Sequence, residues 1–91
     1  MAMNTQAIQI GIDVAKEELV IYRQDLDQVD SLPNTLPSIR RWLKTLPKQA
    51  ALAVEATGTY HMPLTEQAHR AGHRVFVIDG YQLKHYRESV R

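Results

Sequence analysis

The chain of 91 residues contains no cysteine, which excludes a disulfide framework and a thiolate metal site. It has no apolar run close to the ~20 residues that a membrane-spanning helix needs. Its first residues, MAMNTQ, lack the basic start and the apolar stretch of a secretory signal. We therefore expect a cytoplasmic protein without membrane contact.

The length and the composition indicate one small domain. A content of 44% hydrophobic and 23% charged residues is typical of a soluble globular chain. A chain of this size buries only about 60–65% of the surface that its unfolded form exposes, so its core is small. We expect residues 1–91 to form a single domain with an ordered core from about residue 7 to residue 90.

The net charge of +1 hides an uneven distribution. Residues 1–30 carry six acids and two basic residues, a net of −4, whereas residues 31–91 carry four acids and nine basic residues, a net of +5. This asymmetry is compatible with a polyanion that contacts the C-terminal part. Ordinary solvated helix faces explain the same charges, so both interpretations stay open.

Hydrophobic periodicity predicts the elements. Ile8, Ile10 and Ile12 alternate with small or polar residues, which is typical of a strand with one covered face. A similar reading of the rest predicts strands at 7–14, 18–24, 28–34, 50–57 and 73–79. Helices are expected from the N-cap Thr35 to Leu46, from the GTY motif to Gly72, and from Tyr81 to the chain end.

The resulting order is strand–strand–strand–helix–strand–helix–strand–helix, which predicts an α/β fold with a mixed sheet. Right-handed crossovers would set the fourth and fifth strands parallel to the first. This order is that of the ribonuclease H-like fold, in which the first strand is central and the fourth lies beside it. Actin-like ATPase domains open in the same way, so a nucleotide-binding domain is an alternative.

Asp13 and Glu55 are the candidate metal ligands. If the first and fourth strands are neighbours, both carboxylates lie near the carboxyl ends of their strands, where open α/β sheets hold their sites. Two carboxylates repel each other there unless a cation lies between them, and Mg²⁺ prefers such oxygen ligands. A turn role is the simpler interpretation of Asp13 alone, and also of Asp79.

Two stretches carry a resemblance to a known family. IGIDVAKEELVIY, and then VEATGTYHMPLTEQAHRAGHRVFVIDGYQLKHYRES, resemble the N-terminal domain of the DEDD-type insertion-sequence transposases of the IS one-ten group, which includes the Piv and MooV recombinases. That domain is similar to the RuvC resolvase, and the resemblance covers the chain from Ile8. It implies that Asp13 and Glu55 are the first two acids of a catalytic tetrad that binds Mg²⁺ or Mn²⁺, as two ions when complete.

The resemblance also implies what the chain does. The family's last two aspartates usually follow the helix that begins near Tyr81, and this chain stops at Arg91. We therefore expect a truncated RuvC-like domain that is inactive alone and need not hold metal. The full-length family cleaves and exchanges DNA strands for transposition under the guidance of a bridge RNA. DNA, a guide RNA and further copies of the chain are thus the expected partners.

Five residues are candidates for contact with nucleic acid. Thr57 and Tyr60 stand where a helix is expected to open, and N–H groups at a helix start favour phosphate. Lys84, Arg87 and Arg91 recur at about helical spacing in the last helix. Capping, packing and plain surface positions are the alternatives. A non-catalytic nucleic-acid-binding or oligomerisation module is the alternative for the whole chain.

The histidines give no metal site of their own. His69 and His73 are four residues apart, but Gly72 should end the helix between them, which disfavours a zinc pair. His61 and His85 are expected at the surface.

Overall fold

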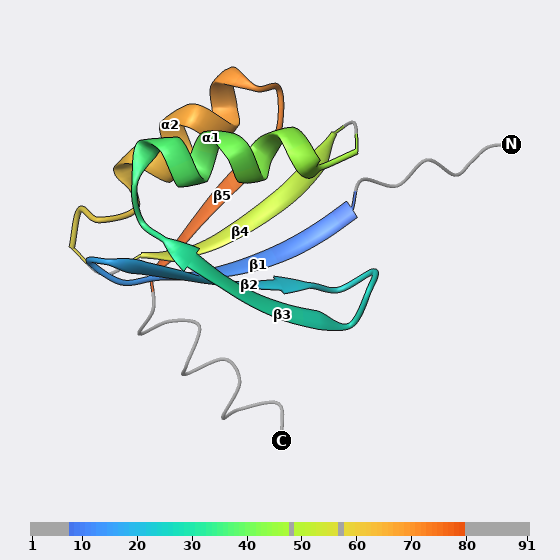
Figure 1. The fold of residues 1–91 in the computed structure, drawn as a ribbon, viewed down its shortest axis with the longest axis horizontal. Coiled ribbons are helices and arrows are strands. Elements are labelled where there is room, and N and C mark those ends of the chain that lie inside the picture. The colour runs from blue at the N-terminus through green and yellow to red at the C-terminus, as the bar shows by residue number, and fades with distance from the viewer. Residues whose placement is uncertain (1–7, 48, 57, 80–91) are drawn as a thin grey trace, which may run out of the picture.

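The structure is a computed structural model that describes residues 8–47, 49–56 and 58–79 (Figure 1). Its elements are β1 (Ile8–Val14), β2 (Glu18–Arg23), β3 (Gln28–Pro33), α1 (Leu36–Thr45), β4 (Ala50–Ala56), α2 (Met62–Arg70) and β5 (Arg74–Asp79). The helix expected from Tyr81 onward lies outside the described residues. Neither described helix has the length and the apolar character needed to span a bilayer.

The five strands form one mixed sheet in the order β3-β2-β1-β4-β5. Antiparallel pairing joins β1 to β2 and β2 to β3, whereas β4 lies parallel to both β1 and β5. The predicted topology is therefore confirmed: β1 is central and β4 lies beside it. Short polar turns can join only antiparallel neighbours, and the two helices supply the longer crossovers that parallel strands require.

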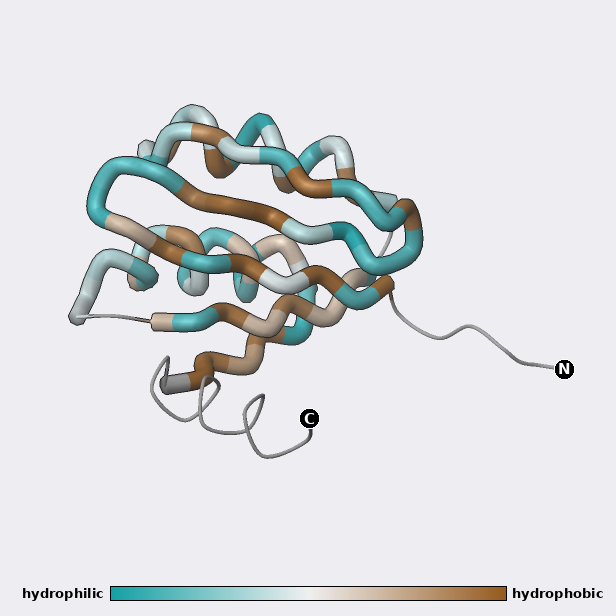
Figure 2. Tube along the Cα trace, turned by 90° about the horizontal axis from the view of Figure 1, so that it is seen from below, coloured by the Kyte–Doolittle hydropathy of each residue, from teal (hydrophilic) through white to brown (hydrophobic). Residues whose placement is uncertain are grey.

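Both described helices lie over the same face of the sheet (Figures 1 and 2). The core between these layers is built from every second residue of the central strands, because alternate side chains of a strand point to the same face. From β1 and β4 it takes Ile10, Ile12, Leu52 and Val54, each no more than 3% exposed. The helices add Ile39 and Leu64 among others, both fully buried.

The helix signals hold for α1 and fail at the start of α2. Thr35 caps α1, since its side chain accepts a hydrogen bond from the Ser38 N–H at 3.4 Å. The expectation that α2 opens at the GTY motif, residues 58–60, is wrong, because α2 begins at Met62. Gly58 has a φ of +69°, which a right-handed helix does not allow, and the Met62 N–H closes a turn onto the Thr59 carbonyl.

His73 joins the start of β4 to the turn before β5. The residue is only 7% exposed, and its Nδ1 accepts a hydrogen bond from the Ala50 N–H at 3.0 Å. Gly72, with a φ of +91°, ends α2 before it, as expected. His73 therefore acts as a buried acceptor for a strand, a structural role that its spacing from His69 did not indicate.

We predict that acid destabilises the fold through His73. Burial lowers the pKa of His73 from its ordinary value of 6.5. Between the lowered and the ordinary pKa the unfolded chain binds a proton that the folded chain does not. The free energy of unfolding should thus fall as the pH drops below about 6.5, by at most about 1.4 kcal/mol per pH unit from this residue.

Urea unfolding between about pH 5 and pH 7.5 would measure this loss. His73→Asn, which keeps an oxygen able to accept from Ala50, should flatten the profile over that range. His69→Asn is the matched control, because His69 is exposed. Equal pH slopes in the two variants would contradict the prediction.

Candidate metal centre at the carboxyl ends of β1 and β4

The two predicted acids are neighbours across the centre of the sheet. Asp13 is the register partner of Glu55 in the parallel pairing of β1 with β4. Register partners on adjacent strands lie about 4.8 Å apart and direct their side chains to the same face. Since Ile12, Val14 and Val54 are buried under the helices, both acids belong to the opposite face. Asp13 is exposed there and Glu55 is half-buried.

Neither carboxylate is neutralised by a side chain that the structure describes. Within residues 8–47, 49–56 and 58–79, no side chain donates a hydrogen bond or forms an ion pair to Asp13 or Glu55, and the one ion pair is Arg23–Asp25 at 2.8 Å. Two like charges this close favour a cation between them. Carboxylate oxygens are also the donors that Mg²⁺ and Mn²⁺ prefer, so the pair fits such an ion.

The pair is an incomplete ligand set. No group of three or more metal-ligating side chains occurs in the part of the chain that the structure describes. In the pairing of β4 with β5, Ile78 is aligned with Glu55 and Asp79 with Ala56. A bound ion would need further oxygens from water, from a substrate phosphate or from acids elsewhere.

Asn34 ties together the two segments that follow the acids. Its Nδ2 donates to the Ala15 carbonyl at 2.9 Å, two residues after Asp13, and to the Tyr60 carbonyl at 3.0 Å, in the turn after Glu55 (the Lys16 carbonyl lies at 3.5 Å). Its backbone N–H also donates to the Glu17 carbonyl at 3.0 Å. One side chain thus links the β1–β2 turn to the turn before α2.

The sequence reasoning missed Asn34. The residue stands between Pro33, the last residue of β3, and the N-cap Thr35, where an asparagine reads as an ordinary loop residue. Its contacts lie 19 and 26 residues away along the chain. No local spacing rule could have found it, although an asparagine directly before a helix cap gave a weak signal.

Among the described residues, two buried polar side-chain atoms near these turns find no hydrogen-bond partner. They are Asn34 Oδ1 and His61 Nδ1. The expectation that His61 lies at the surface is therefore wrong: the residue is half-buried, because it precedes Met62 in the turn that Asn34 holds. A buried polar atom without a partner costs about 1–3 kcal/mol, so an ordered water at either atom would stabilise this end of the sheet.

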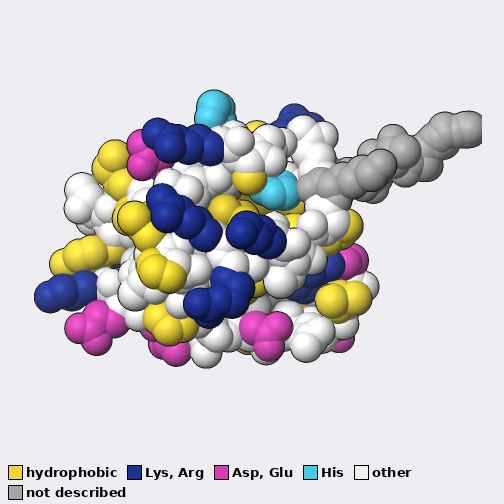
Figure 3. All heavy atoms as spheres, turned by 45° about the horizontal axis from the view of Figure 1, so that its top comes forward, with side chains coloured by type: hydrophobic (Ala, Val, Ile, Leu, Met, Phe, Trp, Pro, Cys, Tyr) yellow, Lys and Arg dark blue, Asp and Glu magenta, His cyan; other side chains and the backbone are white. Residues whose placement is uncertain are grey.

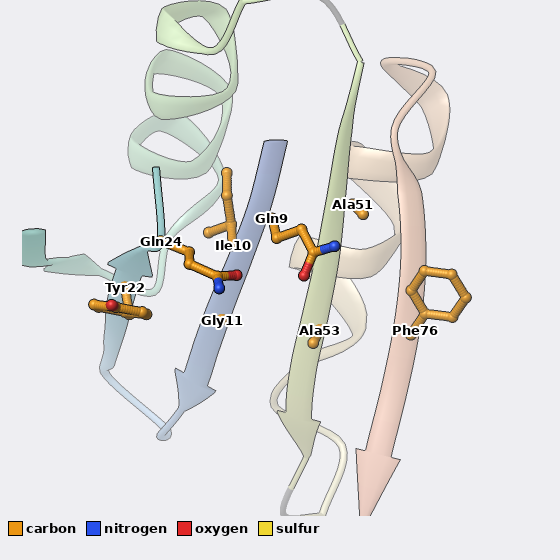
Figure 4. A pocket seen from close by; sticks show the side chains of 8 residues that line it. All are labelled: Gln9, Ile10, Gly11, Tyr22, Gln24, Ala51, Ala53 and Phe76. Atoms are coloured by element: carbon orange, nitrogen blue, oxygen red, sulfur yellow. The ribbon is translucent and has the colours of Figure 1, made fainter. Parts of the chain in front are cut away.

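A shallow hollow of about 320 Å³ lies on the same face of the sheet as the acids. Figure 4 shows Tyr22 and Phe76 at its two sides, with Gly11 and Ala53 between them. A side chain at Gly11 would meet no atom within 4 Å. The backbone at Gly11 is therefore open to approach from this face.

The other candidate residues lie apart from the acid pair or outside the described chain. Tyr60 is 45% exposed in the turn before α2, so it does not belong to the first turn of the helix. Thr57, Lys84, Arg87 and Arg91 fall outside the described residues.

Two pKa shifts occur near the β2–β3 turn, away from the acid pair. The Arg23 guanidinium lowers the pKa of Asp25, and Asp27 raises the pKa of Tyr22.

Comparison with known protein families gives a match over most of the chain. Residues 10–91 match the family DEDD_Tnp_IS110, described as a transposase. A search of curated proteins found no match. The matched range includes both acids and all of the sheet except the first two residues of β1. The chain therefore belongs to the DEDD transposase family of IS110-type insertion sequences.

Proposed function

We propose that this chain forms the front of a ribonuclease H-like catalytic domain, in which Asp13 and Glu55 are two of the acids that hold Mg²⁺ or Mn²⁺ for DNA strand cleavage and exchange. The observation that carries the proposal is the direct register of Asp13 with Glu55 on one face of two parallel central strands. The family match supports a DNA-processing role over an actin-like nucleotide-binding domain.

The roles of the two acids follow from their surroundings. Asp13 is exposed, so it is the ligand that a phosphate-bound ion can reach from solvent. Glu55 is half-buried, so its side chain has fewer accessible rotamers and would hold its carboxylate in place as the second ligand. When bound, divalent ions in such sites lower the pKa of an attacking water or hydroxyl and stabilise the charge of the leaving oxygen.

We further propose that two acids do not suffice for cleavage, so that the 91-residue chain is inactive alone. The remaining ligands of two ions would come from phosphate oxygens, water and additional acids. Guidance by a bridge RNA and assembly with further copies belong to the same proposal. Their support is the family resemblance, because no described contact bears on them.

A metal titration tests the site. In NMR spectra of the 91-residue chain, Mg²⁺ should shift the amide signals of residues around Asp13 and Glu55, and Mn²⁺ should broaden them. Both effects should appear at lower metal concentrations than at amides elsewhere in the chain. Asp13→Asn removes one charge and one strong ligand oxygen, and should weaken the binding of Mn²⁺ about tenfold or more. Asp30→Asn, which removes an exposed acid on β3, is the control and should leave binding unchanged. Equal shifts in both variants would overturn the proposal.

A further inference from the structure

A second hollow, of about 430 Å³, lies on the helical side of the molecule, between α1 and α2 near their C-terminal ends. Its polar lining comes from Arg40 and Lys44 of α1, from Gln67 of α2 and from His73. Leu43 and Leu46 are among the apolar residues that line it. We call this hollow the helical groove. The sheet separates it from the face that carries Asp13 and Glu55.

Every polar side chain that lines the helical groove offers hydrogen-bond donors. The Arg40 Nε donates to the Gln67 Oε1 at 3.3 Å, which occupies the amide oxygen and leaves the amide N–H groups. The His73 Nδ1 accepts from the Ala50 N–H, so the neutral ring carries its proton on Nε2. Lys44 and the remaining N–H groups of Arg40 have no acceptor among the described residues. Such a lining suits an anion with several oxygens.

Positive charge extends beyond the groove. Arg41 and Arg70 are exposed on the same two helices, and Lys and Arg side chains gather over this side of the molecule (Figure 3). The only acid of the two helices is Glu66. No described carboxylate lies within ion-pair distance of any of these cations. The dipole of α1 explains a basic residue in its last turn, Lys44, but not Arg40 four residues earlier.

We propose that the helical groove binds the phosphodiester backbone of a nucleic-acid strand. Four cations spread over two helices match a polyanion better than a single small anion. The apolar residues beside Arg40 and Lys44 can contact a sugar or a base while the cations hold phosphates. Because the sheet separates the groove from the acid pair, the strand held here is a different segment from the one presented to Asp13 and Glu55.

Binding of an unstructured oligonucleotide of about 20 nucleotides, as RNA and as DNA, tests the groove. EDTA is included so that no metal at the acid pair contributes. Arg40→Gln/Lys44→Gln should lower the affinity about tenfold or more at 0.1 M salt, and should reduce the slope of log K against log salt by about 1.4, or about 0.7 for each lost contact. Both residues are exposed, so the variant should fold.

The matched control is Arg23→Gln/Arg74→Gln, which removes the same charge from β2 and β5. It should lose much less affinity. Equal losses in the two double variants would overturn the proposal, because net charge would then explain the binding. Inorganic pyrophosphate that binds as tightly as the oligonucleotide would overturn it as well. Because EDTA is present and the assay reads oligonucleotide binding alone, a failure of the metal site and a failure of the groove can be distinguished.

Discussion

Replacing Asp13 by alanine should abolish recombination by a complete transposase that carries this domain, with a loss of about a thousandfold or more. Metal ions contribute several kcal/mol to the stabilisation of charge in phosphoryl transfer, and each 1.36 kcal/mol corresponds to about a factor of ten in rate. Glu55→Ala should have the same effect, because the two side chains would hold the same ions. Recombination between plasmid-borne donor and target sites would measure it.

The double variant provides a sharper test. Residues that act as one unit are non-additive, so Asp13→Ala/Glu55→Ala should be no worse than either single variant. Asp30→Ala should retain activity, because Asp30 lies on the edge strand β3 and is exposed. All variants should keep their thermal unfolding midpoint within a few degrees. Recombination that survives in either single variant would remove that acid from the proposed site.

Asn34→Ala should have the largest effect on the fold near the site, with a loss of about 2–3 kcal/mol in the free energy of unfolding. The substitution removes side-chain hydrogen bonds to the Ala15 and Tyr60 carbonyls, each worth about 1 kcal/mol, and the carbonyls lose their partner. The two turns that follow the acids then lose their link, which loosens the ends of β1 and β4 that carry the acids. We therefore expect the binding of Mn²⁺ to weaken about tenfold as well.

Urea unfolding and the Mn²⁺ titration measure the two effects separately. Asn34→Asp is the informative second variant, since a carboxylate has nearly the same size but cannot donate to either carbonyl; it should resemble Asn34→Ala. Gln49→Ala removes an amide that makes one 3.4 Å bond, to the Gly72 carbonyl, and should change little. A loss in Asn34→Ala no greater than in Gln49→Ala would show that Asn34 does not position the acids.

The sequence alone determined the order and nature of the elements that the structure describes. Alternation at Ile8, Ile10 and Ile12 predicts a strand with one covered face, and Thr35 predicts the start of α1. The sequence suffices for both predictions because each signal involves only residues a few positions apart. Chain order and right-handed crossovers then predicted the parallel pairing of β1 with β4. The start of α2 was missed because Gly58 has a positive φ, which a right-handed helix does not allow, although the residues around it favour a helix start.

Only the tertiary structure decided which distant groups meet. The sequence placed Asp13 and Glu55 at two strand ends, but their direct register depends on how β4 docks against β1, a pairing across 42 residues. The Asn34 link and the His73 acceptor likewise join groups at least 19 residues apart. Local patterns report propensity and burial, whereas hydrogen-bond partners and charge separation arise when the packed layers bring remote segments together.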